Sequence, residues 1–332
     1  MGMINNEPII GVTMGDCAGI GPEIILKSQK NLALKSRKII VIGNVYVMEK
    51  VKDAIGIGGI HINRISKASE ADFSQGVLNV LHLDNIKIHE LLPGKVQSMA
   101  GNAAYEYLVK AIELAMNKEI DAIATAPLNK EAMQLAGYQY AGHTEILAAQ
   151  TNTKDYAMFL YDKQLKVIHV STHISLKQAI DSLNKDRVAA VIQIANDIMV
   201  KIGYKNPKIA VAGINPHAGE GGLFGDEEIR EIIPAIEKMK QKGINVSGPI
   251  SPDTIFVRAH QGEYDIVVAM YHDQGHIPLK LLGFHSGVNV TAGLPIIRTS
   301  VDHGTAFDMA WKGIANELSM VEAINLAIRL IN

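Results

Sequence analysis

Residues 9–23 read IIGVTMGDCAGIGPE, an apolar run that leads through a glycine-rich turn into a proline. The apolar and β-branched residues at 9–14 predict a buried strand. Pro22 suits a first helical turn and predicts a helix over 22–35. A strand joined to a helix by a short turn is the repeating unit of α/β proteins, so this stretch favours that fold class.

The same alternation continues along the chain. Further segments indicate strands at 38–43 and 121–126 and helices at 97–118, 186–201, 226–242 and 320–331. This order predicts a mostly parallel sheet with helices on both faces. At 332 residues the chain exceeds the size at which one core keeps growing, so two domains or one elaborate α/β unit are expected.

The composition excludes several classes of protein. Lys and Arg number 32 against 34 Asp and Glu, and no basic run is long enough to follow a phosphate backbone, so nucleic acid is not expected as a partner. Apolar stretches are strand-sized and no signal peptide is seen, which predicts no membrane span and a cytoplasmic location. The single cysteine, Cys17, excludes an intrachain disulfide and is compatible with a reducing compartment.

The glycine-rich turn at 15–23 has two interpretations. Backbone amides where a strand leads into a helix can hold an anion, but a tight turn explains the glycines equally well. The turn is not a dinucleotide-binding fingerprint, because Ile24 stands where the third glycine would fall. It also lacks the Lys and Ser/Thr of a P-loop.

Three histidines each come a few residues after a strand-like run and are followed by turn residues. They are His173, His217 and His272, after runs at 166–170, 208–214 and 264–270. Because ligands bind at the carboxyl ends of strands in open α/β sheets, three such imidazoles can converge. Each alone is better interpreted as a loop residue, but together they are typical of a catalytic divalent metal site.

A second group of polar residues lies between 280 and 308. It comprises Lys280, Asn289, Arg298, Asp302, His303 and Thr305, interspersed with glycines that let the backbone approach a ligand. Lys280 and Arg298 suit a phosphate or carboxylate group. A solvated loop is the alternative, although the mixture of apolar and polar residues favours a site.

These motifs together resemble the 4-hydroxythreonine-4-phosphate dehydrogenase family. The resemblance rests on segments in the same order along nearly the whole chain: 11–23, 125–130 (TAPLNK), 142–145 (GHTE), 172–173, 215–222, 271–275 and 287–305. It implies an NAD-dependent β-decarboxylating dehydrogenase with the fold of isocitrate and isopropylmalate dehydrogenases. That fold has two α/β/α domains with an active-site cleft between them, here 1–130 with 283–332, and a central domain at 131–282 that carries the metal ligands and dimer contacts.

The resemblance also assigns roles to residues. It implies a homodimer whose metal site is shared between subunits, with His173, His217 and His272 as ligands and the last coming from the partner subunit. It implies substrate contacts from His143, Thr144, Lys280, Asn289 and Arg298. The segment 303–308 resembles the adenosine-side loop of isopropylmalate dehydrogenases, which implies cofactor contacts from His303, Gly304 and Asp308. The cofactors implied are NAD and one divalent ion, Zn, Mg, Mn or Co.

Two departures from the family pattern matter. Cys17 replaces the usual proline of the family's GDPAG loop. After the HDQG segment, the vitamin B6 biosynthetic enzymes continue Leu-Pro, whereas this chain has His276. That continuation is similar to the branch that acts on 4-phospho-D-threonate and 4-phospho-D-erythronate, which we favour over 4-hydroxythreonine-4-phosphate dehydrogenase of pyridoxal 5'-phosphate biosynthesis.

The expected reaction oxidises the C3 hydroxyl of the phosphorylated acid, passes a hydride to NAD and loses carbon dioxide to give dihydroxyacetone phosphate. A divalent cation would favour loss of the hydroxyl proton and stabilise the enolate. Lys280 and Asp273 are the candidates for proton transfer, and a pure phosphate clamp is the alternative for Lys280. A metal-dependent phosphate-ester hydrolase is the alternative from another class. Metal storage would leave the polar residues of 280–308 without a role.

Overall fold

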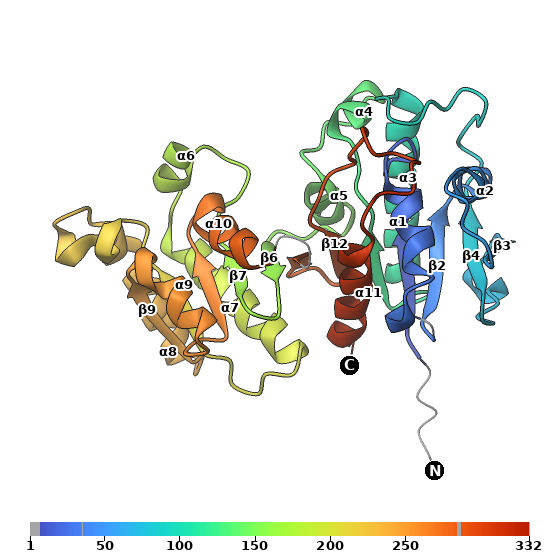
Figure 1. Cartoon of the computed structure of the whole chain (residues 1–332). Coiled ribbons are helices and arrows are strands. Elements are labelled where there is room, and N and C mark those ends of the chain that lie inside the picture. Colours follow the sequence, from blue (N-terminus) through green and yellow to red (C-terminus); the bar gives the residue numbers. More distant parts are fainter. Residues whose placement is uncertain (1–6, 35, 284–286, 332) are drawn as a thin grey trace, which may run out of the picture. The chain divides into compact units, whose positions relative to one another are not determined.

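The computed structural model describes residues 7–34, 36–283 and 287–331, which form two compact units (Figure 1). Unit 1 comprises the residues up to 153 together with 294–331, and unit 2 comprises 154–293. The chain passes between the units further along than the limits of 130 and 283 expected from the sequence. Both termini of the described chain belong to unit 1.

Unit 1 contains a parallel sheet. Its described strands, in spatial order, are β3 (His61–Ile65), β4 (Val77–His82), β2 (Lys38–Gly43), β1 (Ile9–Thr13), β5 (Ala122–Thr125) and β12 (Ile297–Val301). The strands are almost wholly buried, as expected when helices cover both faces of a parallel sheet.

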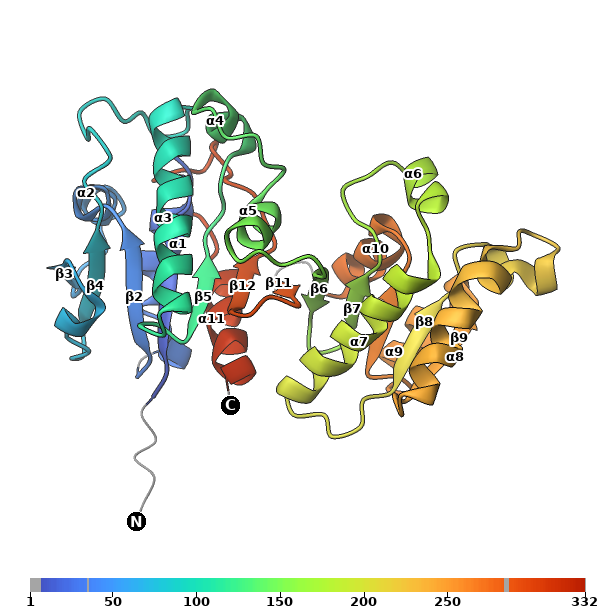
Figure 2. The same cartoon turned by 180° about the vertical axis from the view of Figure 1, so that it is seen from behind.

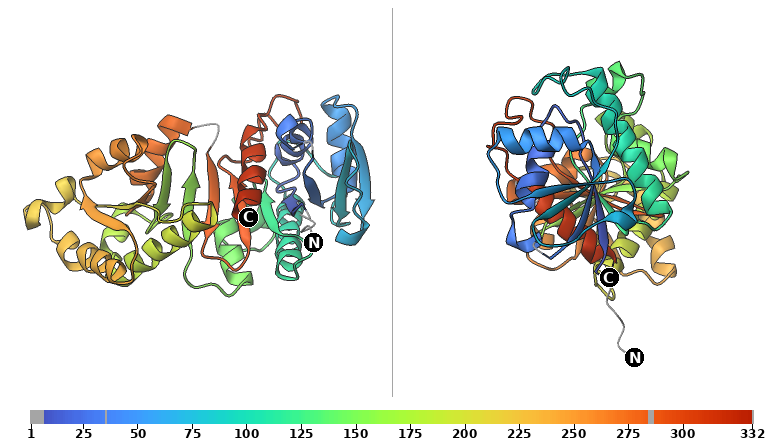
Figure 3. Two further views of the ribbon diagram at one scale, coloured as in Figure 1. Left: turned by 90° about the horizontal axis from the view of Figure 1, so that it is seen from below. Right: turned by 90° about the vertical axis from the view of Figure 1, so that its right-hand side faces the viewer.

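Helices lie on both faces of the unit 1 sheet. α3 (Ser98–Met116) is in front of it in Figure 2, whereas α1 (Gly21–Ser28) and α11 (Leu318–Ile331) are in front in Figure 1, and Figure 3 shows the sheet edge-on between them. The other helical segments are α2 (Val45–Ala54), α4 (Lys130–Leu135), α5 (His143–Gln150), η1 (Leu32–Leu34) and η2 (Ala68–Glu70).

The helix predicted over 22–35 is wrong in its C-terminal half. α1 ends at Ser28, and Lys35 lies outside the described residues. Past the helix end, the Asn31 side chain accepts a hydrogen bond from Ala33 N at 3.0 Å. Such local side-chain bonds compete with continuation of a helix, which explains the early end.

Unit 2 contains a mixed sheet, not a fully parallel one. Its described strands, in spatial order, are β11 (Val288–Ala292), β6 (Ala157–Tyr161), β7 (Lys166–His169), β10 (Ile266–Ala269), β8 (Ile209–Ala212) and β9 (Val246–Ile250). β6 is antiparallel to both β7 and β11, and the remaining pairs are parallel. The three runs predicted before His173, His217 and His272 are therefore the parallel neighbours β7, β8 and β10.

Helices also cover both faces of the unit 2 sheet. α7 (Lys185–Lys201) and α8 (Ile233–Gln241) lie on the face seen in Figure 2, and α9 (Pro252–His260) and α10 (His272–Gly283) lie on the face seen in Figure 1. α6 (Leu176–Asp181) follows β7. The predicted helix 226–242 is interrupted: a π-helical turn, η4 (Glu228–Ile232), precedes α8, whose second residue is Pro234. Proline lacks an amide donor, so a regular helix cannot run through it undisturbed.

The order of strands in unit 1 identifies where a ligand would bind. β2 lies on one side of β1 and β5 on the other, so the chain changes direction across the sheet between β1 and β5. The carboxyl ends of strands at such a switch point form the usual ligand crevice of α/β sheets. The segments that follow β1 and β5 meet there, since Asp16 N donates to Pro127 O at 2.9 Å. None of the helices that the structure describes is long and apolar enough to cross a lipid bilayer.

Candidate active site

Arg298 places a buried cation at the switch point of unit 1. It lies on β12 next to β5, is only 2% exposed, and donates to Thr125 Oγ1 from Nε (3.2 Å) and Nη2 (2.6 Å). Burial lowers the pKa of Arg298 to about 9, and Glu145 acts in the opposite direction. The guanidinium therefore stays charged at neutral pH. A desolvated guanidinium held in one orientation is suited to bind a phosphate or carboxylate.

His143 and Thr144 begin α5 and belong to the same part of unit 1. Desolvation lowers the pKa of His143 well below its ordinary value, Arg298 lowers it further, and a hydrogen bond to the Ala126 backbone opposes both. The imidazole is therefore neutral and lies within electrostatic range of Arg298. The structure thus brings together the predicted substrate residues of unit 1, and it adds Thr125 and Glu145, which the quoted motifs contain but to which the sequence assigned no role.

The predicted cofactor segment packs against the glycine-rich turn. Thr305 O accepts a hydrogen bond from Ile20 N at 3.0 Å, and a Cβ on Gly19 would lie 2.8 Å from the same oxygen. The turn is buried throughout, which favours its interpretation as a packed strand-to-helix turn over an anion-binding loop. His303 and Gly304, by contrast, are exposed, and no heavy atom lies within 4 Å of a Cβ built on Gly304.

Asp16 is an ionisable residue that the sequence reasoning did not single out. It is fully buried in the turn, its Oδ1 accepts from Ala18 N at 2.9 Å, and its Oδ2 has no hydrogen-bond partner in the described part of the chain. Burial raises the pKa of Asp16 to about 7. Burial also raises the pKa of the neighbouring Cys17 thiol, so this thiol is not a nucleophile at neutral pH.

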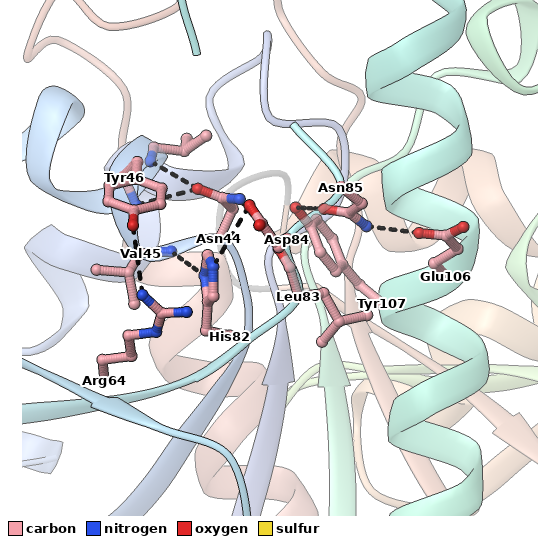
Figure 4. Close-up of polar contacts among 11 residues, drawn as sticks. Asn44, Val45, Tyr46, Arg64, His82, Leu83, Asp84, Asn85, Glu106 and Tyr107 are labelled. Carbon is pink, nitrogen blue, oxygen red and sulfur yellow. Dashed lines mark hydrogen bonds and ion pairs between the residues drawn. The ribbon is translucent and has the colours of Figure 1, made fainter. Parts of the chain in front are cut away.

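A second polar group lies at the carboxyl ends of β2 and β4 (Figure 4). His82 Nδ1 accepts from Val45 N at 3.1 Å, and the His82 ring meets the Tyr46 ring edge-on at 5.4 Å. Asn85 accepts from the Tyr107 hydroxyl at 2.9 Å and donates to Glu106 at 2.7 Å. These bonds join α2 and α3 to the carboxyl end of β4 and the segment that follows it.

In unit 2 the structure brings together two of the three predicted metal ligands. The ring centres of His173 and His272 lie 5.9 Å apart. Two imidazoles that bind one divalent ion through nitrogen have ring centres roughly 5 to 6 Å apart, given metal–nitrogen bonds of about 2.1 Å. His272 Nδ1 donates to Asp273 Oδ1 at 2.7 Å, which leaves Nε2 as the nitrogen available to a metal.

Gln274 fixes the start of α10 on the sheet. Its side chain accepts from Met270 N at 2.6 Å and donates to Gly213 O at 2.8 Å, so it joins the ends of β10 and β8. His272 therefore begins a helix whose first turn is anchored at two strands. The sequence reasoning quoted Gln274 within a motif but gave it no role.

His217 lies apart from this pair, in a strained loop. Five consecutive residues, His217 to Gly221, have φ between +45° and +79°. This left-handed conformation costs about 1–2 kcal/mol for each residue that has a Cβ, and such strain is concentrated at functional sites. Buried Glu228 holds the loop by accepting from Ile214 N and Asn215 N, both at 2.8 Å. Among the described residues, no group of three His, Cys, Asp or Glu side chains is arranged to hold a metal within one chain.

Glu228→Gln is expected to lower the free energy of unfolding by about 2 kcal/mol, because Oε2, which accepts from Asn215 Nδ2 at 2.9 Å, would become an amide donor that faces another donor. The midpoint of urea unfolding measures this. Glu237→Gln is the matched control, since Glu237 is exposed and its ion pair with Lys240 is worth under about 0.5 kcal/mol. Equal midpoints for the two variants would show that Glu228 does not hold the loop.

The two remaining substrate candidates also lie in unit 2. Asn289 is on β11, and its Oδ1 is buried without a hydrogen-bond partner among the described residues. Lys280 is in the last turn of α10, two helical turns after His272. The structure thus divides the predicted substrate residues between unit 1 (His143, Thr144, Arg298) and unit 2 (Lys280, Asn289).

Comparison with known proteins identifies the family. The family model described as pyridoxal phosphate biosynthetic protein PdxA matches residues 35–327. The chain belongs to the PdxA family. This PdxA-family chain is similar in sequence to the D-threonate 4-phosphate dehydrogenase of Pectobacterium atrosepticum. The two are 55% identical over 97% of this chain and 99% of that protein.

Solved structures agree with the PdxA assignment. A crystal structure described as 4-hydroxythreonine-4-phosphate dehydrogenase from Klebsiella pneumoniae shares 52% identity over 98% of each chain, with a TM-score of 0.91. A β-decarboxylating dehydrogenase from Thermococcus kodakarensis shares the fold alone, with 14% identity and a TM-score of 0.50 over 96% of this chain and 82% of its own. The predicted family, the predicted fold relationship and the predicted dehydrogenase class are therefore confirmed.

Proposed function

We propose that this PdxA-family chain oxidises the C3 hydroxyl of 4-phospho-D-threonate or 4-phospho-D-erythronate with NAD, and that β-decarboxylation then gives dihydroxyacetone phosphate. The observation that carries the proposal is Arg298, a buried cation held by Thr125 at the ligand crevice beside neutral His143. Such a site selects an anionic group and excludes water from it. The relative from Pectobacterium atrosepticum supports a phosphorylated four-carbon acid as the substrate class.

The histidines of unit 2 fit a divalent metal ion. The support is the pair of ring centres 5.9 Å apart and the bond from His272 Nδ1 to Asp273, because ligating histidines usually donate their second nitrogen to a carboxylate. His173, His217 and His272 would hold the ion, with Zn, Mg, Mn or Co as candidates. The approach of His173 and His272 within one chain departs from the expectation that His272 comes from the partner subunit. When bound, a divalent ion favours ionisation of a coordinated hydroxyl and stabilises negative charge on oxygen.

The chain's own groups then divide the remaining tasks. Arg298, His143 and Thr144 bind the charged end of the substrate, and Asn289 offers a buried amide oxygen that accepts a hydroxyl proton. Asp273 accepts a hydrogen bond from His272, so we assign to Asp273 the orientation of the His272 imidazole. We assign proton transfer to Lys280, which also binds the substrate.

NAD fits the exposed segment after β12. His303, Gly304 and Asp308 would hold it, and the open space beside Gly304 lets a ligand approach the backbone closely. NAD accepts the hydride when bound. This segment rests on the buried turn at 15–21, which gives it a rigid support.

Exposed apolar side chains support a homodimer formed through unit 2. Each predicted metal ligand has such residues close by in the chain: Leu176 (56% exposed) after His173, Leu223 (73%) after His217, and Ile277 (59%) after His272. Apolar groups gathered around a site of this kind indicate that another protein surface covers them. We therefore place the subunit interface at the metal ligands.

A second candidate is oxidation of 4-phosphohydroxy-L-threonine, favoured by the likeness to the Klebsiella pneumoniae structure. The test is NADH formation by purified protein with Mg²⁺, Mn²⁺, Co²⁺ or Zn²⁺ on this compound and on the two phosphorylated sugar acids. Preference for the sugar acids is the expected result. Preference for phosphohydroxythreonine would replace it with the second candidate, and no NADH from any of the three would favour the hydrolase alternative.

A further inference from the structure

His276 and His169, which have no role in the proposed function, lie close to His272. His276 follows His272 by one helical turn on α10, and i,i+4 spacing places both on one face of the helix. The two rings are stacked, with centres 3.6 Å apart and planes 11° apart. His276 Nδ1 donates to His272 O at 3.0 Å. This bond fixes the orientation of the His276 ring, which in turn limits the rotation of the His272 ring.

His169 supports His276 from the sheet. It is the last residue of β7 and only 1% exposed, and its ring centre lies 4.8 Å from that of His276 and 6.5 Å from that of His272. His169 Nδ1 donates to Met158 O on the neighbouring strand β6 at 3.2 Å. The three rings thus form a row that runs from the interior of the sheet to the predicted ligand.

Gly275 allows this row to form. A Cβ on Gly275 would lie 2.6 Å from Val167 Cγ1 and would overlap His169 Nε2. Val167 and His169 point to the same face of β7, because side chains alternate along a strand. The absence of a side chain at 275 therefore lets α10 approach β7 closely enough for His169 to reach His276.

We propose that His276 and His169 are positioning residues for His272, whose imidazole they hold in the orientation required of a divalent-metal ligand. The inference rests on the metal assignment of the proposed function. Asp273 accepts a hydrogen bond from His272 Nδ1, and His276 stacks on the face of the His272 ring. Together these contacts restrict rotation of the ring, so that His272 Nε2 points in a single direction. A ligand fixed in this way loses less side-chain freedom when the ion binds. Residues that orient a ligand typically contribute tenfold to a hundredfold to metal affinity.

The test compares Co²⁺ affinity among full-length variants, measured by calorimetry and by the visible absorption of bound Co²⁺. His276→Leu fills the same space without a planar ring and is expected to weaken Co²⁺ binding by about tenfold to a hundredfold. His276→Phe keeps the stacked ring and is expected to restore most of the affinity. His169→Leu is expected to fall between the wild type and His276→Leu. His260→Ala, at an exposed histidine on α9, is the matched control and should bind as the wild type does.

Thermal unfolding of the metal-free proteins separates positioning from a general loss of structure. We expect His276→Leu to unfold within a few degrees of the wild type, so that its loss of affinity reports on His272. If His276→Leu does not fold, the Co²⁺ affinities of His276→Phe and His169→Leu are compared with that of the wild type instead. Wild-type affinity in both His276→Leu and His169→Leu would overturn the inference and leave the proposed function intact. A wild-type protein that binds no Co²⁺ would overturn both, whereas Co²⁺ binding without NADH formation from any of the three candidate substrates would contradict the proposed reaction alone.

Discussion

Arg298→Ala is expected to lower kcat/KM for 4-phospho-D-threonate by about 10²- to 10⁴-fold, because it removes two charge-assisted hydrogen bonds worth about 1.5–3 kcal/mol each. The loss appears chiefly in KM if the phosphate is bound equally in the ground state and the transition state. Initial rates of NADH formation, with the phosphorylated acid and with D-threonate as the dephosphorylated analogue, measure the effect. The analogue is expected to lose far less, because it never made these bonds.

Two variants control for indirect effects at this position. Arg298→Lys keeps a positive charge but loses the planar fork, and it should recover part of the lost kcat/KM. Thr125→Val leaves the guanidinium but removes the hydroxyl that accepts from it, and a loss much smaller than that of Arg298→Ala is expected. If Arg298→Ala reduces kcat/KM equally for the phosphorylated and dephosphorylated acids, Arg298 is not the phosphate anchor.

His217→Ala should abolish metal-dependent NADH formation, with a fall in kcat of about 10³-fold or more, because the ion contributes several kcal/mol of charge stabilisation. The protein should remain folded, since His217 lies on an exposed loop that buried Glu228 holds through backbone amides. Alanine at 217 still has to adopt a positive φ, so the circular dichroism spectrum and the melting temperature should be checked. His260→Ala is again the matched control.

The outcome also bears on how the ligands are distributed between subunits. Mixed dimers of His217→Ala and His272→Ala chains would regain one intact site if each site takes its ligands from both subunits. Recovery of up to about a quarter of wild-type activity on equimolar mixing would support a shared site, because half of the dimers are mixed and each of these has one intact site of two. Full wild-type turnover by His217→Ala alone would remove His217 from the metal site.

The sequence predicted the strands before the three histidines well, because apolar β-branched runs bounded by turn residues are a strong local signal. It also singled out Arg298 and His143, which the structure brings within electrostatic range of each other, while their roles in binding stay predictions. It did not predict Glu228 or His169, since each acts on a partner that is remote in the sequence. The end of α1 was missed because the competing Asn31 turn is a local hydrogen bond that periodicity does not report.

The metal ligands, the cofactor segment and the general base stay predictions, and no group of three His, Cys, Asp or Glu side chains that could hold a metal comes together among the described residues. His173 and His272 could be paired from sequence only by the expectation that strand ends meet at one edge of a sheet. The antiparallel strand β6 was not foreseen, since a buried antiparallel strand has the same apolar composition as a parallel one.

The discontinuity of unit 1 has a consequence for synthesis of the protein. β5 gains its neighbour β12, and the unit 1 core gains α11, only from residues after 294. A ribosome makes those residues after unit 2, so β5 has an unpaired edge while unit 2 is being made. We therefore expect nascent chains that stall before residue 294 to be retained by chaperones, and residues 294–331 to decide whether newly made protein aggregates or reaches its native state.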